Sequence, residues 1–194
     1  MNINPLVLGP DAVQQISKDR AQLATKVYPE KDASQARAAL AAEDRSLGLA
    51  HEIFTLGLYA LTTRTEAPQP AGVRVLELKG QTPTAFYDIA DARRGQMKQM
   101  SATSPYPALF AQALDKVAAS DRGTQSFDLR LLRVPALNFE ALWLHTGTGD
   151  DDMVVPLREF HGFTPMLPIP YKDALERLRE PAERASRQDD AMGS

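Results

Sequence analysis

The sequence contains no cysteine, which excludes disulfides, thiolate metal sites and cysteine nucleophiles together. It also has no excess of charge of one sign, because 22 basic residues stand against 25 acidic ones. A surface with this balance does not concentrate phosphates around itself, so nucleic acid is not an expected partner.

Long hydrophobic runs are absent as well. The longest apolar stretch, Leu47 to Leu61, is interrupted by His51, Glu52 and Thr55, and it is shorter than the roughly 20 residues that a membrane-spanning helix needs. Near the N-terminus, residues 6–8 form a short apolar run with no Lys or Arg before it, which does not resemble a Sec signal. The sequence therefore predicts a soluble protein of the cytoplasm that does not bind membranes.

Hydrophobic residues nevertheless make up 43% of the 194 residues, which is enough to build a core. The expected organisation is one domain over residues 1–180, followed by a polar, disordered tail over residues 181–194. Its fold class is predicted as α+β, with a mostly antiparallel sheet of about five strands and helices packed on one face.

Helical spacing of apolar residues predicts two N-terminal helices, one from Pro10 and an alanine-rich one from about Asp32. The apolar segment from Ser46 to Thr63 is predicted as a third, buried helix, although two short strands remain an alternative. A fourth helix is predicted after Ser104 and Pro105, which provide an N-cap and a proline at the first helical position. Residues 172–180 are predicted as a short final helix.

Alternating apolar residues predict strands in two regions. Val73 to Leu78 and Ala85 to Ile89 are separated by a Gly80 turn and should form a hairpin. Three further strand-like runs are joined by short connections and should form a C-terminal three-strand meander. These runs are Phe127–Val134, Asn138–His145 and Met153–Phe160. The middle run is apolar on both sides and is expected to be central, and the segment over residues 91–103 is expected to be a mobile loop or a poorly anchored helix.

The histidines are the natural starting point for a search for chemistry. Two of them belong to one predicted hairpin with an acidic turn, and this group suits a divalent metal by ligand type. The weak metal candidates are His145, Asp150, Asp152 and His161. Their spacing matches no established ligand pattern, so a charged hairpin turn is the simpler interpretation. His51 is expected to be a hydrogen-bonded core residue rather than a general base.

Two segments are candidates for binding a partner. The extended, proline-rich stretch at residues 164–171 exposes apolar side chains at low entropic cost, unless it packs over the sheet. The basic loop near residue 93 could contact an anionic ligand. The predicted partner-binding residues are Met166, Leu167, Ile169, Tyr171, Arg93 and Arg94.

No serine lies in a Gly-x-Ser-x-Gly elbow, and no catalytic residue or cofactor is predicted from the motifs present. The first hypothesis is therefore a noncatalytic binding or protein-interaction protein, of an accessory, adaptor or immunity type, whose partner is another protein and which could form homo-oligomers. The alternative is a metal-assisted hydrolase of unrecognised family that uses the two histidines and the acidic turn.

Overall fold

The computed structural model describes residues 2–27, 31–42, 44–64, 67–101, 104–120 and 125–192. Its elements in chain order are β1 (Asn2–Asn4), α1 (Pro10–Val27), α2 (Ala33–Ala42), β2 (Arg45–Thr55), α3 (Leu58–Thr63), β3 (Gln69–Lys79), β4 (Thr82–Ile89), β5 (Met97–Ser101), α4 (Tyr106–Ala119), β6 (Ser126–Val134), the 3-10 helix η1 (Pro135–Leu137), β7 (Phe139–His145), β8 (Met153–Pro156), β9 (Ile169–Pro170) and α5 (Tyr171–Met192). None of the described helices is long and apolar enough to cross a lipid bilayer.

Hydrogen bonding joins the nine described strands into an open, mixed sheet in the order β5-β4-β3-β2-β6-β7-β8-β9, with β1 paired to β6. The chain divides into two compact units. The first, called the meander unit, comprises Met1–Pro5, His51–Ala71 and Leu109–Ser194, and the second, called the hairpin unit, comprises Leu6–Ala50 and Gly72–Ala108. That residues 1–180 fold as a single domain stays a prediction.

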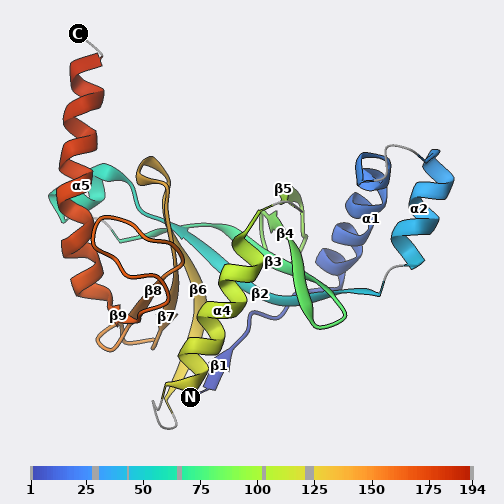
Figure 1. Cartoon of the computed structure of the whole chain (residues 1–194), viewed down its shortest axis with the longest axis horizontal. Coiled ribbons are helices and arrows are strands. Elements are labelled where there is room, and N and C mark those ends of the chain that lie inside the picture. The colour runs from blue at the N-terminus through green and yellow to red at the C-terminus, as the bar shows by residue number, and fades with distance from the viewer. Residues whose placement is uncertain are drawn as a thin grey trace. The chain divides into compact units, whose positions relative to one another are not determined.

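The meander unit is built around β6 and β7 (Figure 1). β6 pairs antiparallel with β7 but parallel with both β1 and β2, and β7 pairs antiparallel with β8. The predicted three-strand meander is thus confirmed. Phe139 and Trp143 on one face of β7 belong to the same buried cluster as Leu178 of α5. On the other face, the ring of His51 from β2 stacks on Phe110 of α4, with their centroids 4.7 Å apart.

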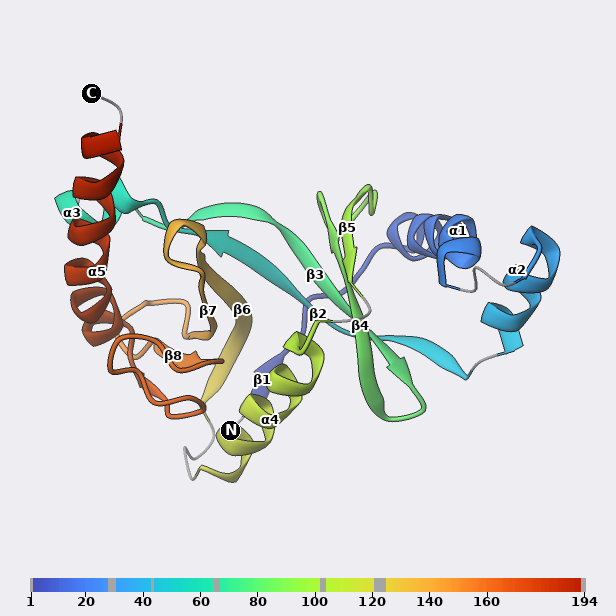
Figure 2. The same ribbon diagram turned by 45° about the horizontal axis from the view of Figure 1, so that its top comes forward.

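The hairpin unit contains the predicted β3–β4 hairpin, and β5 adds to its β4 edge. Ile16 of α1 packs into a buried cluster with Val75 and Ile89, and α2 lies beside α1 (Figure 2). Gly95, in the turn before β5, allows α1 to pack closely against this turn, because a Cβ atom there would lie 2.5 Å from the Cα of Ala12 in α1. Its φ of +68° also favours glycine.

The predicted fold class is wrong in three respects. The sheet has nine described strands rather than about five, it is mixed because β6 pairs in parallel with β1 and β2, and helices of the meander unit cover both faces rather than one. The physical reason is that β1 and β2 pair with β6, which lies more than 70 residues later in the chain. Pairing between such distant segments leaves no local pattern in the sequence.

The helix predicted from Ser46 to Thr63 is also wrong, since this segment forms β2 and then the short α3. Apolar residues on both sides of β2 imitate a buried helix when the neighbouring strands are unknown. Gly48 of β2 marks a close approach, because a Cβ atom there would lie 2.9 Å from Cγ of Leu78. Gly57, just before α3, has no atom within 4 Å of such a Cβ.

Two further segments differ from their predictions. Residues 97–101 form the edge strand β5 rather than a loop or helix, because β4 offers them a pairing partner. The final helix is longer than predicted: α5 passes through Pro181 and ends at Met192, where the sequence indicates a disordered tail. Ala174, Leu178 and Ala182 of α5 are fully buried, and their packing helps to offset the hydrogen bond that a proline removes from the helix. In contrast, Ser104 caps α4 as predicted, with its Oγ accepting from the amide of Tyr106 at 3.1 Å.

Candidate functional site

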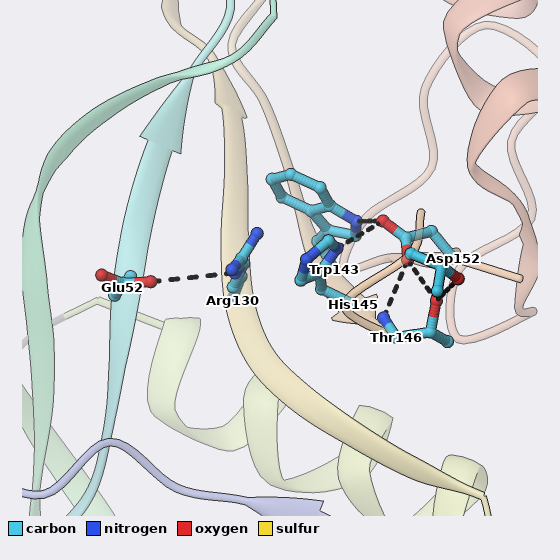
Figure 3. A network of polar contacts seen from close by, with 7 residues as sticks. Glu52, Arg130, Trp143, His145, Thr146 and Asp152 are labelled. Carbon is cyan, nitrogen blue, oxygen red and sulfur yellow. Dashed lines mark hydrogen bonds and ion pairs between the residues drawn. The ribbon is translucent and has the colours of Figure 1, made fainter. Parts of the chain in front are cut away.

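Asp152 is the centre of a polar network at the end of the β7–β8 hairpin (Figure 3). Its Oδ2 accepts hydrogen bonds from Nε1 of Trp143 at 2.6 Å and from Nδ1 of His145 at 2.8 Å. Its Oδ1 accepts from the amide and the hydroxyl of Thr146, at 2.8 and 3.0 Å. An ionised carboxylate is only an acceptor, so Nδ1 of His145 carries the proton in this contact. Both carboxylate oxygens are therefore engaged.

The local sequence explains why these groups meet. Trp143 and His145 are two residues apart on β7 and so share one face of the sheet. Gly147 and Gly149 have φ values of +84° and +81°, which allow the connection to reverse direction and return Asp152 to this face. Burial opposes ionisation of Asp152, but hydrogen bonds from His145, Thr146 and Trp143 outweigh it and hold the pKa of this carboxyl below its ordinary value.

A row of charged and aromatic side chains extends from this network across the same face of the sheet (Figure 3). Arg130 of β6 lies opposite Trp143, with its guanidinium carbon 5.0 Å from the Trp143 ring centroid and 4.8 Å from that of Phe54. Its Nε lies 3.7 Å from Oε2 of Glu52. Cation–π contact on two rings fixes the guanidinium more firmly than the ion pair does, because Glu52 is 44% exposed.

The same network fixes the start of α5. The amide of Tyr171 donates to the backbone oxygen of Asp152 at 2.9 Å, and the Tyr171 ring stacks on Trp143 with an interplanar angle of 14°. Burial and the negative charge of Asp152 raise the pKa of Tyr171 to about 12, so its phenol stays neutral. Asp152 thus holds the first residue of α5 as well as the β7–β8 turn.

A groove lies between α3 and the first turns of α5, which follow Tyr171. α3 packs against α5, and Figure 2 shows the short α3 crossing behind it. The volume of the groove is about 370 Å³. The residues that line it are Leu56, Ala60, Leu61, Arg64, Lys172, Asp173, Leu175, Glu176 and Arg179. The four apolar residues of this set form the floor, and the five charged ones form the rim; we call the whole set the α3–α5 groove.

The four metal candidates do not form one site. His145 and Asp152 meet, as described, but Asp150 is exposed and lies 3.4 Å from Nζ of Lys172. His161 lies on the loop after β8, with a φ of +38°, and lines a different cavity beside Pro181. Within the described ranges no group of three or more His, Cys, Asp or Glu side chains is placed to hold a metal ion.

The predicted partner-binding residues also differ in how exposed they are to solvent. In the proline-rich stretch, Leu167 is 53% exposed, whereas Ile169 is buried, Tyr171 stacks on Trp143 and Met166 is half-buried. Ile169 and Tyr171 therefore pack into the meander unit, whereas Leu167 presents an exposed apolar side chain.

Arg93 and Arg94 belong to the hairpin unit, in a turn that precedes β5. Their side chains are exposed, and their backbone amides donate to Oδ1 of Asp91 at 2.8 and 2.7 Å. These two backbone hydrogen bonds hold the pKa of Asp91 below its ordinary value. His51 is fully buried on β2, where it stacks on Phe110, and is thus a core residue of a strand rather than of the predicted helix.

Sequence reasoning missed a second polar cluster, in the hairpin unit. Glu77 of β3 is 1% exposed and pairs with Arg20 of α1, with Nε and Oε2 2.8 Å apart, and with Arg45 of β2. Its Oε2 also accepts from the hydroxyl of Tyr87. Burial and this hydrogen bond raise the pKa of Tyr87 above its ordinary value. The available signal was that charged residues, Arg74 and Glu77, interrupt the apolar run of β3, since a buried charge requires a partner.

A neighbouring pair in the same unit follows the hairpin register. Arg74 of β3 lies opposite Asp88 of β4, and two guanidinium nitrogens reach the two carboxylate oxygens at 2.6 and 2.8 Å. The guanidinium carbon lies 3.9 Å from the ring centroid of Phe86 and 4.2 Å from that of Tyr106. This pair is buried and joins the start of α4 to the hairpin.

Comparison of the chain with protein-family models, with curated proteins and with solved structures gives no significant match, so the functional argument rests on these residues and their geometry.

Proposed function

We propose that this chain is a noncatalytic protein-binding module, which takes an apolar segment of another protein into the α3–α5 groove. The observation that carries this proposal is the anatomy of the groove. Leu56, Ala60 and Leu61 form a floor that is at most 7% exposed, and Leu175 extends it from α5. A ring of charged side chains surrounds this floor, as in protein interfaces with an apolar centre and a polar rim.

The Asp152 network supports a structural role for the groups that the alternative hydrolase would use. Both carboxylate oxygens of Asp152 accept hydrogen bonds from Trp143, His145 and Thr146, and its backbone oxygen accepts one from the amide of Tyr171. These contacts hold α5 in place as one wall of the groove. A binding site built on firmly held elements loses less entropy when its ligand binds.

The test is a selection of short peptides from a random displayed library on the purified full chain, followed by affinity measurement of the selected peptides. Leu175→Ser removes part of the floor and should weaken binding about tenfold. Tyr59→Ser is the matched control, because Tyr59 lies on the same short helix α3, is 68% exposed and does not line the groove. It should leave the affinity unchanged.

Two results would contradict the proposal. One is a selection that recovers no peptide that binds the chain. The other is binding that is insensitive to Leu175→Ser but lost with Leu167→Ser, since this result would assign recognition to the stretch at residues 164–171 instead.

A further inference from the structure

The rim of the α3–α5 groove has more positive than negative side chains. Arg64, Lys172 and Arg179 stand against Asp173 and Glu176. Lys172 has a counterion outside the groove, Asp150, and both of these side chains are at least 75% exposed. Because the two side chains are equally open to solvent, their charges largely cancel, and the charge that distinguishes the rim is that of its arginines.

The excess is concentrated where two arginines share one carboxylate. A terminal nitrogen of Arg64 lies 3.3 Å from Oε1 of Glu176, and Arg179 pairs with the other oxygen, Oε2. Arg179 is further positioned by its Nε, which donates to the backbone oxygen of Leu61 at 3.4 Å. One carboxylate cannot neutralise two guanidinium groups, and guanidinium geometry suits a second carboxylate.

We infer that the segment bound by the groove carries an acidic side chain next to its apolar anchor. This inference rests on the proposed function and adds the chemistry of the partner. The anchor lies on the floor made by Leu56, Ala60, Leu61 and Leu175, and the acidic side chain reaches Arg64 and Arg179 at the rim. Charge complementarity of this kind selects among partners and speeds their association.

The experiment uses the peptides selected on the full chain, synthesised with blocked termini. Each acidic residue is changed to its amide, Glu to Gln or Asp to Asn, and the affinity is compared with that of the parent peptide. We expect about a fivefold loss at low salt and a smaller loss at high salt. Arg64→Gln should weaken the parent peptide by a similar factor and should have little further effect on the amide peptide.

Glu176→Gln separates this charge effect from a general loosening of the groove. It removes the carboxylate that competes for Arg64 and Arg179, so the parent peptide should bind more tightly, by about threefold. A variant that only disturbed the groove would weaken binding instead. Tyr59→Ser again provides the control on α3.

The possible failures are distinguishable. If the selection yields peptides without acidic residues, or if the amide peptides bind as well as their parents, the inference is overturned while the proposed function stands. If no peptide is recovered, the proposed function itself fails. Concentration-dependent self-association of the chain that Arg64→Gln abolishes would overturn the inference by assigning the groove to a second copy.

Discussion

Each unit contains a buried carboxylate with several partners, Glu77 in the hairpin unit and Asp152 in the meander unit, but these two carboxylates are stabilised differently. In the hairpin unit, Glu77 is neutralised by the guanidinium groups of Arg20 and Arg45. In the meander unit, Asp152 has no arginine or lysine among its hydrogen-bond donors in the described structure and is held by Trp143, His145 and Thr146.

The difference lies in how far the partners are separated along the chain. Glu77 joins α1 and β2 by ion pairs and β4 by a hydrogen bond from Tyr87, so its removal leaves two cations behind in a buried setting. The side-chain donors to Asp152 all lie within nine residues of it, so its bonds first of all shape a turn. We therefore expect the hairpin unit to depend more strongly on its carboxylate than the meander unit does.

The largest expected effect is that of Glu77→Gln. It removes the counter-charge of Arg20 and Arg45 and should lower the free energy of unfolding of the hairpin unit by about 3 kcal/mol. Hydrogen exchange of the β3 and β4 amides measures this loss locally. Glu159→Gln, at an exposed glutamate, is the control. Equal exchange in the two variants would show that the cluster contributes little.

Asp152→Asn should have the next largest effect, a loss of about 2 kcal/mol. Asparagine has only one acceptor oxygen, and its amide group faces the N–H donors of Trp143 and His145. Trp143 is the single tryptophan of the chain, so its fluorescence during urea unfolding reports on the meander unit. The neighbouring, exposed Asp151→Asn is the control, and a loss as large in that variant would contradict the prediction.

Lowering the pH tests the contribution of Asp152 in another way, because it protonates the carboxylate without replacing the side chain. The pKa of Asp152 is lowered in the folded state, so its contribution is present above the unfolded value of about 3.8 and is lost as the pH falls through the folded value. The difference in unfolding free energy between the natural chain and Asp152→Asn should therefore shrink below about pH 4. A constant difference down to pH 2 would refute this account.

The smallest effect compares two glycines. Gly48→Ala in the hairpin unit places a Cβ atom 2.9 Å from Cγ of Leu78 and should cost about 1 kcal/mol. Gly57→Ala in the meander unit meets no atom within 4 Å and has an ordinary φ of −79°, so it should change the free energy of unfolding by less than about 0.5 kcal/mol. Denaturant titration of both variants measures these values, and a reversed order would contradict the packing around Gly48.

Local patterns predicted the elements whose partners are close in sequence. The β3–β4 hairpin and the β6–β7–β8 meander follow from alternating residues with short connections. Ser104 marks the start of α4 by its own capping bond. The parallel pairing of β2 with β6 has no such marker, and without it the apolar run that begins at Leu47 is indistinguishable from a buried helix.

The candidate site was predicted in part for the same reason. His145 and Asp152 are seven residues apart around a glycine-containing turn, so their meeting could be anticipated from sequence. The α3–α5 groove could not, because α3 was hidden in the predicted long helix and no local pattern indicates that it packs against α5. Its two walls are more than 100 residues apart in the chain.

The amino-acid sequence by itself determined the absence of cysteine chemistry, the balanced charge and the local elements, because these depend on composition or on residues a few positions apart. Only the tertiary structure decided which strands pair in parallel, which carboxylates are buried and where the groove lies. These features arise from contacts between distant segments, and their free energy appears only when both partners are in place.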